Sequence, residues 1–335
     1  MKKTMKKITA DELKTILELH KKWLAKQTDG VQADLGWVDL GWVDLSGTDL
    51  RWADLSRASL SGADLRWADL TRADLSGANL SGANLSEAVL RWADLSGANL
   101  SGAKLYRADL SGAKLYRADL NVASLRKANL YSADLRGTFL TEAALSEAVL
   151  RWADLSGASL RKANLHLADL SVADLSGADL GEAVLNWADL DVASLRKANL
   201  HLADLSGANL SGADLSEAKG LPPICCPEKG SFIGFKKCSG LLGDCIVELE
   251  ITEDALRSSA TTRKCRCSKA KVLSITNLDG SPYDENRAFS THDPSFEYVV
   301  GRTVEVNEFN TYRWRECSSG IHFFITRAEA VNYVC

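Results

Sequence analysis

The residues of this 335-residue chain that could do chemistry lie mostly in its last third. All eight cysteines follow residue 224, and six of them could supply zinc ligands: Cys225, Cys226, Cys238, Cys245, Cys265 and Cys267. Structural zinc sites usually contain a Cys-x-x-Cys pair, which the sequence lacks, although Cys265 and Cys267 on one strand would direct both thiols to the same face. We therefore expect thiols that bind no metal, and disulfides only if the protein is exported.

A second set of residues in this region could form a nucleophilic site. Cys317 has His322 five residues later, and His292 is followed by Asp293. A cysteine nucleophile needs a base within hydrogen-bond reach, and spacing alone does not establish that. Because His322 lies in the apolar run Ile-His-Phe-Phe-Ile, the sequence favours a histidine packed in the core. We predict no catalytic, cofactor-binding or metal-binding set, and keep a ligand-binding or catalytic C-terminal domain as an alternative.

The middle of the chain is built from a five-residue repeat. Leucine occupies every fifth position from Leu35 to Leu215, 37 times without a gap, in the consensus Ala-Asp/Asn-Leu-Ser-Gly. A period of five fits neither an α-helix nor a flat strand, so the backbone must turn regularly. If Ala and Leu point inward, five residues form one side of a coil, and Ser, Gly, Asp and Asn suit the corners. Stacked coils would then pair as parallel strands.

This pattern resembles the pentapeptide repeat family. The resemblance implies a mainly β fold, a right-handed quadrilateral β-helix with four repeats in each coil. The predicted rod has a little over nine coils and a length of ~44 Å at the usual strand spacing. The expected organisation is an N-terminal segment 1–30 with a capping helix at about 10–26, the β-helix 31–217, a linker 218–223 and an α+β domain 224–335.

The N-terminal segment has the pattern of an amphipathic helix. Thr9 and Glu12 have the spacing of a capping box. One helical stripe then carries apolar side chains, among them Leu13, Ile16, Leu17 and Trp23. Because this helix directly precedes the first repeat, we expect it to cap the first coil. The alternative is a helix lying on a membrane surface, because its opposite face is rich in lysine.

The C-terminal domain has a different composition, with more β-branched and aromatic residues. The predicted strands are Ile246–Ile251, Lys271–Ile275, Tyr298–Val306 and Ile321–Ile325, and the predicted helices are Thr252–Ser258 and a last one from Thr326 to about Tyr333. The stretches Arg263-Lys-Cys-Arg-Cys-Ser-Lys-Ala-Lys-Val and Glu316-Cys-Ser-Ser-Gly-Ile-His-Phe-Phe-Ile-Thr resemble an uncharacterised domain that often follows pentapeptide arrays in phage and bacterial proteins. That resemblance implies a boundary and no activity.

Aspartates form a column along the predicted rod. With four repeats in a coil, every fourth repeat stacks on the same side, and the column before Leu35, Leu55 and their successors has Asp at eight of ten positions. Its candidate interaction residues are Asp34, Asp54, Asp74, Asp94, Asp134, Asp154 and Asp174. Some pentapeptide repeat proteins are thought to imitate duplex DNA and occupy the DNA groove of type II topoisomerases. Residues 31–217 carry 17 basic and 25 acidic residues, a net charge of −8, against ~26 charges on ~44 Å of duplex DNA.

Tryptophan and arginine gather at outward-facing corners of the first coils. These corners carry Arg51, Trp52, Arg72, Arg91 and Trp92. Trp and Arg are enriched at binding hot spots, and the same pairing could stack single-stranded nucleic acid. The structural alternative is that each Trp packs on the neighbouring coil with Arg stacked over it. We expect the part of the rod near Trp52 to Trp92 to be the main binding patch.

The leading hypothesis is a non-enzymatic scaffold that binds another protein. Its net charge of −4 does not favour nucleic acid as a partner. The basic start is not followed by an apolar stretch, and no segment is long and apolar enough to span a membrane, so we expect a cytoplasmic protein without a membrane partner. The alternatives are a DNA-mimicking inhibitor of a DNA-binding enzyme or an antiviral defence complex, for which a homodimer would lengthen the rod, and an active C-terminal domain.

Overall fold

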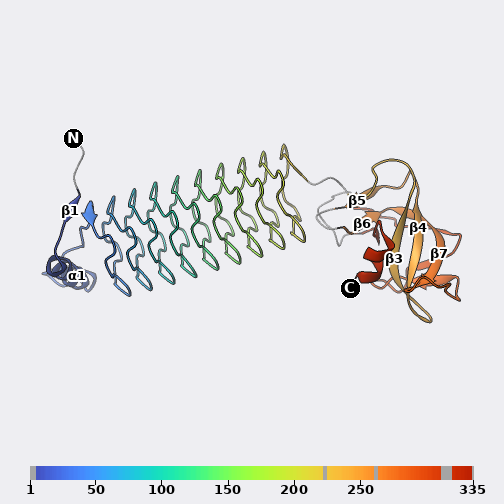
Figure 1. The fold of residues 1–335 in the computed structure, drawn as a ribbon, viewed down its shortest axis with the longest axis horizontal. Coiled ribbons are helices and arrows are strands. Elements are labelled where there is room, and N and C mark those ends of the chain that lie inside the picture. Colours follow the sequence, from blue (N-terminus) through green and yellow to red (C-terminus); the bar gives the residue numbers. More distant parts are fainter. Residues whose placement is uncertain (1–4, 222–224, 260–262, 311–318, 334–335) are drawn as a thin grey trace. The chain divides into compact units, whose positions relative to one another are not determined.

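The computed structural model describes residues 5–221, 225–259, 263–310 and 319–333. The chain divides into two compact units, Met1–Leu221 and Pro222–Cys335. The first unit is a stack of coils and the second is built around β-strands (Figure 1).

The first unit is a β-helix with a four-sided coil. Parallel bridges join each repeat to the fourth repeat after it, from Asp34↔Asp54 to Asn199↔Lys219, so each coil consists of four repeats. Backbone hydrogen bonds join stacked sides in both directions. Leu55 and Arg57 donate to the carbonyls of Asp74 and Ser76 at 2.7 and 2.9 Å, and Asp74 donates to the carbonyl of Ala53 at 2.9 Å. The coils therefore satisfy one another's backbone groups.

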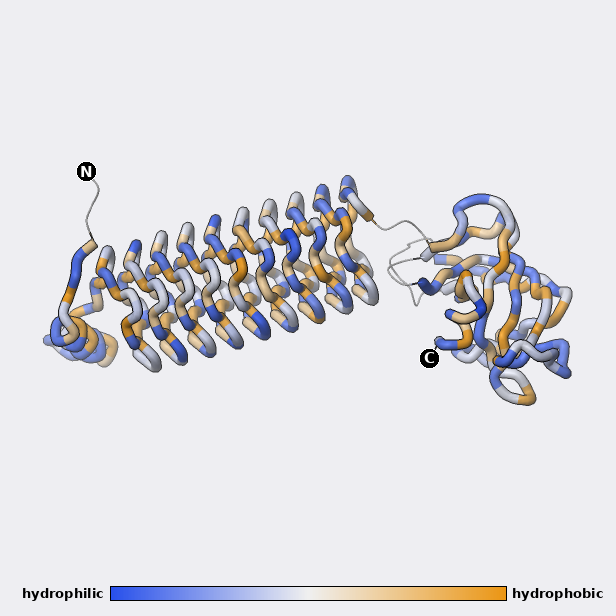
Figure 2. The backbone as a smooth tube through the Cα atoms, in the orientation of Figure 1, coloured by the Kyte–Doolittle hydropathy of each residue, from blue (hydrophilic) through white to orange (hydrophobic). Residues whose placement is uncertain are grey.

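The inside of the β-helix is filled by alanine and leucine. Leu55 and Ala53 are fully buried, and nearly every equivalent pair along the stack is buried like them. Hydrophobic and hydrophilic residues consequently alternate around each coil (Figure 2). Each buried leucine contributes about 1.5–3 kcal/mol of transfer free energy. Where Thr138 replaces alanine, its hydroxyl donates to the carbonyl of Leu135 at 2.7 Å, which removes the cost of burying it.

The remaining positions of the consensus repeat, Asp or Asn before the leucine and Ser-Gly after it, form the corners of the coil. The Asp or Asn before each leucine accepts the backbone N–H two residues later, as Asp54 Oδ1 does from Ser56 at 2.8 Å. The second residue after each leucine has a positive φ, +65° at Gly112 and +60° at Trp92. Glycine adopts this left-handed conformation freely, whereas another residue is strained by about 1–2 kcal/mol. Each large side chain at this position therefore lowers the free energy of unfolding of the β-helix through backbone strain.

The N-terminal helix α1 (Ala10–Leu24) follows β1 (Lys6–Lys7), which pairs in parallel with β2 (Val38–Asp39). Thr9 and Glu12 form both hydrogen bonds of the capping box. Leu13 is buried, and Ile16, Leu17 and Trp23 on the same stripe are partly buried.

The end of α1 is joined to the first coil. His20 is fully buried, and its Nδ1 accepts the backbone N–H of Ala33 at 3.1 Å. Its ring stacks on Trp23 with 5.6 Å between centroids. The N–H of Val31 also donates to the carbonyl of Leu19 at 3.1 Å. The helix ends at Leu24, two residues earlier than the sequence predicts, and Lys26 then takes a φ of +58° that turns the chain.

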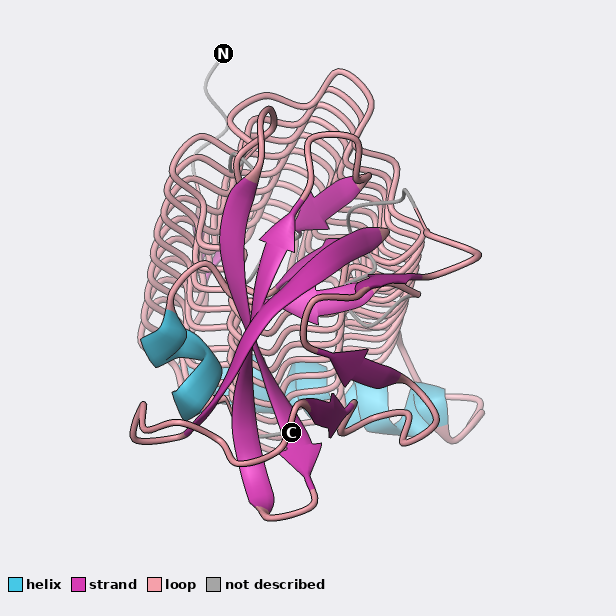
Figure 3. Ribbon diagram, turned by 90° about the vertical axis from the view of Figure 1, so that its right-hand side faces the viewer, coloured by secondary structure: helices cyan, strands magenta, loops and turns pink. Residues whose placement is uncertain are grey.

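The second unit contains two antiparallel sheets. The strands are β3 (Phe232–Gly240), β4 (Gly243–Ile251), β5 (Arg257–Ser259), β6 (Cys265–Cys267), β7 (Lys269–Asn277), β8 (Arg287–Phe289), β9 (Glu297–Val299), β10 (Thr303–Glu305) and β11 (Ile321–Phe323). One sheet has the order β10-β7-β4-β3-β8-β9 and the other β11-β6-β5. Figure 3 shows the strands of this unit in magenta. Mutual backbone hydrogen bonds of 2.8 Å between Phe235 and Phe324 join them. Buried side chains such as Val247, Leu249 and Phe323 form the core.

The second unit has less helix than the sequence predicts. Its described residues contain one α-helix, α2 (Arg327–Asn332), which packs beside β3 and has the capping box expected of Thr326 and Glu329. The predicted helix Thr252–Ser258 is wrong. Arg257 donates to the carbonyls of Thr252 and Glu253, which closes a turn, and β5 begins at once. Arg257 also donates to the carbonyls of Pro227 and Gly230, at 3.1 and 2.8 Å, and β5 pairs with β6. These tertiary contacts override the local helical signal.

The strand predicted at Tyr298–Val306 is interrupted. The chain turns between β9 and β10, where Gly301 has a φ of +83° and the N–H of Arg302 donates to the carbonyl of Val299. Strand β3 is absent from the sequence-based expectations. Within the described ranges, no helix is long and apolar enough to cross a membrane.

Candidate functional site

Three corner side chains of consecutive coils line an open groove on the β-helix. Trp52, Arg72 and Trp92 occupy the same corner of successive coils, and the groove between them has a volume of about 460 Å³. Its rim carries Asp74, Asp94 and Lys114. We call this surface, defined by these six residues, the Trp/Arg groove. Three predicted corner residues and two predicted aspartates therefore lie together.

Each tryptophan of the Trp/Arg groove contacts the corner residue of the next coil. The guanidinium carbon of Arg72 is 4.7 Å from the centroid of the Trp52 ring. A β-carbon added to Gly112 would lie 2.5 Å from Cε3 of Trp92, so the Trp92 ring covers that glycine. Trp52 nevertheless remains 45% exposed and Trp92 60% exposed. The rings are thus held by the rod on one side and are accessible on the other.

Two predicted residues, Arg51 and Arg91, do not line this groove. Arg51 binds Asp49 through Nη2 and Oδ2 at 2.6 Å and approaches Asp69 at 3.7 Å, and Arg91 lies 3.8 Å from Asp109. The Arg51 hydrogen bond holds the pKa of Asp49 below its usual value. Arg51 instead contributes, with Trp23 and Trp52, to a second hollow beside α1. Arg51 and Arg91 thus form ion pairs with aspartates at neighbouring corners.

The predicted aspartate column is stacked along one edge by the parallel bridges. One carboxylate oxygen of each member accepts the backbone N–H two residues later, as seen at Asp34, Asp54, Asp74, Asp94, Asp134, Asp154 and Asp174. Two basic side chains contact the column. Lys114, which occupies one of its positions, lies 3.7 Å from Asp94. Arg136 beside the column lies 2.7 Å from Asp134 and 3.7 Å from Asp154. Hydrogen bonding to Arg136 lowers the pKa of Asp134. The column therefore stabilises corners and is partly neutralised.

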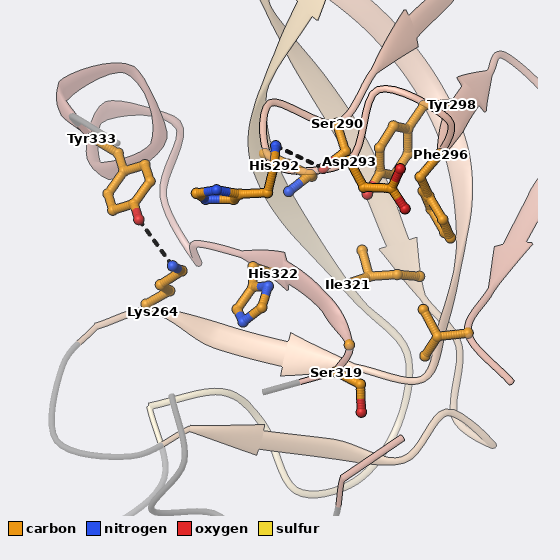
Figure 4. Close-up of a pocket in the computed structure, with 13 residues that line it drawn as sticks. Lys264, Ser290, His292, Asp293, Phe296, Tyr298, Ser319, Ile321, His322 and Tyr333 are labelled. Atoms are coloured by element: carbon orange, nitrogen blue, oxygen red, sulfur yellow. Dashed lines mark hydrogen bonds between the residues drawn. The ribbon is translucent and has the colours of Figure 1, made fainter. Parts of the chain in front are cut away.

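The second unit contains a cavity of about 450 Å³ lined from several strands and loops (Figure 4). Lys236 of β3, Lys264 before β6, His292 of the β8–β9 loop, His322 of β11 and Tyr333 after α2 line part of it. The remaining wall includes Asp293, Phe296, Tyr298, Val306 and Ile321. These residues are far apart in sequence, so only the folded sheets bring them together.

His322 is not the packed core histidine that the sequence favours. Its neighbours Ile321 and Phe323 are buried, at 1% and 0% exposure, and face the core. His322 is half-buried and lines the cavity. Successive residues of a strand point to opposite faces, which explains the difference. Cys317, the nucleophile considered with it, lies outside the described residues.

Comparison with known proteins assigns the first unit. Pentapeptide repeats match residues 33–72, 63–102, 73–112, 103–141, 143–181, 168–207 and 183–219. The chain belongs to the pentapeptide repeat family. Residues 222–330 match a second family, described as a family of unknown function (DUF5758).

Several individual proteins resemble parts of this pentapeptide repeat protein. An uncharacterized protein of Acanthamoeba polyphaga mimivirus is 40% identical over 102 residues, which cover 26% of this chain and 61% of that protein. The match thus spans less than two thirds of this viral relative.

Solved structures of similar proteins are also known. HetL, which is involved in heterocyst differentiation regulation in the cyanobacterium Nostoc sp. strain PCC 7120, is 40% identical over 60% of this chain and 94% of its own, with a TM-score of 0.39. QnrB1, a plasmid-mediated fluoroquinolone resistance protein, is 22% identical over 55% of this chain and 89% of its own, with a TM-score of 0.31.

The cysteines of this pentapeptide repeat protein form no metal site within the part of the chain that the structure describes. Cys238 and Cys245 face each other across β3 and β4, and both are buried. Burial raises the pKa of Cys238 to about 12 and that of Cys245 to about 11. A hydrogen bond with Cys226, together with burial, also raises the pKa of Cys265. These thiols are therefore protonated and weakly nucleophilic at neutral pH.

Lys236 is one of the cavity residues that the sequence reasoning missed. It is only 6% exposed, and it shares the inward side of β3 with Gly234 and Cys238, both of which are buried. The available signal was the alternation Phe232, Gly234, Lys236, Cys238, which places a charge in the buried register of a strand.

Proposed function

We propose that this pentapeptide repeat protein is a non-enzymatic scaffold whose β-helix binds another protein through the Trp/Arg groove. The observation that carries the proposal is the alignment of Trp52, Arg72 and Trp92, one per coil, with half of each tryptophan still exposed. Tryptophan and arginine contribute most to binding at protein interfaces.

The geometry favours binding because the tryptophan side chains have little conformational entropy left to lose when a partner binds. Stacking of Trp52 under Arg72 and of Trp92 over Gly112 holds both rings before a partner arrives. Their exposed fractions of 45% and 60% leave roughly 150–250 Å² of ring surface, worth up to about 4–6 kcal/mol when fully covered. Asp74, Asp94 and Lys114 on the rim would orient a partner that carries both charges.

Several finer features belong to this proposal. We propose that the β-helix is right-handed, as the family resemblance implies, and that α1 caps its first coil by covering the edge that would otherwise be unpaired. We also propose cytoplasmic localisation and the boundary at residues 218–223 between two independently folded domains.

DNA mimicry is the second candidate, favoured by the stacking of aspartates along one edge. Two observations weigh against it. One oxygen of each carboxylate is used by a backbone N–H, and Lys114 and Arg136 neutralise the middle of the column. Competition with duplex DNA for a bound partner would favour mimicry, and reversal of the column to lysine would then abolish inhibition.

The test compares tryptophans that are matched in structure. The immobilised full chain and a Trp52→Gly/Trp92→Gly variant are incubated with extract of the native cell, and retained proteins are quantified. Trp187→Gly is the control, because Trp187 is 62% exposed and covers Gly207 as Trp92 covers Gly112. Each substitution restores the consensus glycine at a positive φ, so folding is preserved.

The proposal predicts that the groove variant retains at least tenfold less of a partner protein than the wild type does. The Trp187→Gly control should retain the same amount as the wild type. Retention of no macromolecule by the wild type, or an equal loss in both variants, would reject the Trp/Arg groove as a binding surface.

A further inference from the structure

The backbone beneath the Trp/Arg groove is already engaged within the β-helix. The N–H groups of Trp52 and Trp92 donate to the carbonyls of Thr71 and Ser111 on the next coil, each at 3.0 Å. A partner cannot use these groups to add an extra strand, because that mode of binding needs free backbone groups at a sheet edge. Recognition at this groove therefore depends on its side chains.

Arg72 brings hydrogen-bond donors to the middle of the groove. Its guanidinium carbon lies 4.7 Å from the centroid of the Trp52 ring, and it forms no ion pair with any residue that the structure describes. A guanidinium group carries five N–H donors in its plane, so contact with a ring leaves them available to a partner. The groove thus favours a partner that offers acceptors, such as carbonyl oxygens, between the two tryptophans.

The separation of the two tryptophans selects among the conformations that a bound segment can take. Parallel bridges join Asp54 to Asp74 and Asp74 to Asp94, so Trp52 and Trp92 are two coils apart at the same corner, a distance of about 9.6 Å at the usual strand spacing. A polyproline II helix repeats every three residues, or about 9.3 Å. Side chains on one face of a β-strand recur about every 6.6–6.8 Å, and two turns of an α-helix span about 10.8 Å. The polyproline II repeat fits best.

A polyproline II segment also has the chemistry that the groove requires. Its backbone forms no internal hydrogen bonds, so its carbonyls are free to accept from Arg72. Proline-rich segments hold this conformation before binding, lose little entropy, and dock into grooves lined by aromatic rings. Trp52 and Trp92, each with an exposed side, provide two such rings.

Asp74 on the rim adds a preference for positive charge. Its Oδ1 accepts the N–H of Ser76 at 2.9 Å, and the carboxylate forms no ion pair within the described part of the chain. Asp94, by contrast, lies 3.7 Å from Lys114. Asp74 is therefore the rim carboxylate that is available to a lysine or arginine of a partner.

We propose that the partner bound by the Trp/Arg groove presents a proline-rich segment in the polyproline II conformation, with a lysine or arginine among the prolines. Prolines three residues apart pack on the exposed sides of Trp52 and Trp92, and the carbonyls between them accept from Arg72. The basic side chain binds Asp74. This inference rests on the proposed protein-binding function of the groove and names the class of partner.

The experiment measures binding of fluorescently labelled peptides to the full-length protein by fluorescence anisotropy. The first peptide consists of Pro-Pro-Lys repeats. The second has glycine in place of every proline and therefore keeps the charge without the polyproline II preference, and the third has glutamine in place of every lysine. The Pro-Pro-Lys peptide should bind at least tenfold more tightly than either of the others.

Protein variants assign the binding to the groove. Trp52→Gly/Trp92→Gly should weaken binding of the Pro-Pro-Lys peptide tenfold or more, whereas Trp187→Gly should leave it unchanged. Asp74→Asn should remove the preference for the lysine peptide over the glutamine peptide. Asparagine preserves the corner, since Asn79 Oδ1 accepts the N–H of Ser81 at 3.2 Å in an equivalent position. Far-UV circular dichroism checks that each variant folds.

Equal binding of the proline and glycine peptides, or no binding of the Pro-Pro-Lys peptide at millimolar concentration, would overturn the inference. Binding that the folded Trp52→Gly/Trp92→Gly variant leaves intact would overturn it as well. If the wild type still retains a partner protein from cell extract through these tryptophans, only the partner class is rejected and the proposed function stands. If that retention is also absent, both are rejected.

Discussion

The packing of Trp92 on Gly112 makes a quantitative prediction about two glycines that differ only in what covers them. Gly112 and Gly97 have φ angles of +65° and +64°, and no atom lies within 4 Å of a β-carbon added to Gly97. Gly97→Ala should therefore cost only the strain of the left-handed conformation, about 1–2 kcal/mol. Gly112→Ala should cost more, because its β-carbon would lie 2.5 Å from the Trp92 ring and must displace it.

The size of the difference follows from the exposure of Trp92. The residue is 60% exposed, so about two-fifths of its surface, roughly 60–100 Å², is covered in the folded state. Losing that contact costs about 1.5–2.5 kcal/mol at about 25 cal/mol per Å². Gly112→Ala should thus lower the free energy of unfolding of the β-helix by that amount beyond Gly97→Ala.

Urea denaturation followed by far-UV circular dichroism measures both variants against the wild type. Repeating Gly112→Ala in a Trp92→Gly background completes a double-mutant cycle, in which the extra cost should vanish. If Gly112→Ala and Gly97→Ala destabilise the rod equally, or if the extra cost persists without Trp92, the ring does not pack on the next coil. The basis for a pre-positioned Trp/Arg groove would then be lost.

Three further predictions concern the caps and the thiols. Thr9→Ala removes one hydrogen bond of the capping box and should destabilise α1 by about 1 kcal/mol, seen as faster proteolysis before the first coil. Burial lowers the pKa of His20 although Asp49 opposes the shift, so the stability it contributes is complete above the unfolded pKa of about 6.5 and falls as pH drops below it. The protection factors of the α1 amides, which are corrected for the intrinsic pH dependence of exchange, should fall between pH 7.5 and 5.5, and His20→Gln should remove that fall. Cys238 and Cys245, with pKa values raised to about 12 and about 11, should resist alkylation at pH 8 until the protein is unfolded, and prompt labelling of the native protein, read by mass spectrometry, would contradict their burial.

The β-helix could be predicted from sequence because each of its positions recurs. Ala53 and Leu55 are buried for the same reason as every other pair, so period alone identifies inside, corner and column. The same regularity places Trp52, Arg72 and Trp92 on one face. The repeat pattern could not show that Arg51 lies outside the Trp/Arg groove. Its position depends on ion pairs between its guanidinium group and Asp49 and Asp69.

The second unit was less predictable because its structure depends on contacts between distant segments. Strand β3 escaped prediction since Lys236 and Lys237 interrupt its apolar alternation. The cavity could not be foreseen from spacing, because Lys236, Lys264 and His322 come from three different strands or strand ends. The hydrophobic neighbours of His322 suggest that it is buried with them. On a strand, however, adjacent side chains point to opposite faces, so buried neighbours place His322 on the other face.

Pairing of each repeat with the fourth repeat after it means that duplication within this gene sets orientation as well as length. An insertion of one whole coil leaves every later side chain on its own face, whereas an insertion of a single repeat moves it to the adjacent face. The near-copies Ser86–Leu100 and Ser146–Leu160 are three coils apart, so Trp92 and Trp152 point in the same direction. The Arg-Lys-Ala-Asn-Leu segments recur every seven repeats instead, and their ion pairs with glutamate wind around the rod, at Arg126, Arg161 and Arg196. The length of the duplicated unit thus determines whether a motif is repeated as a straight row or as a spiral.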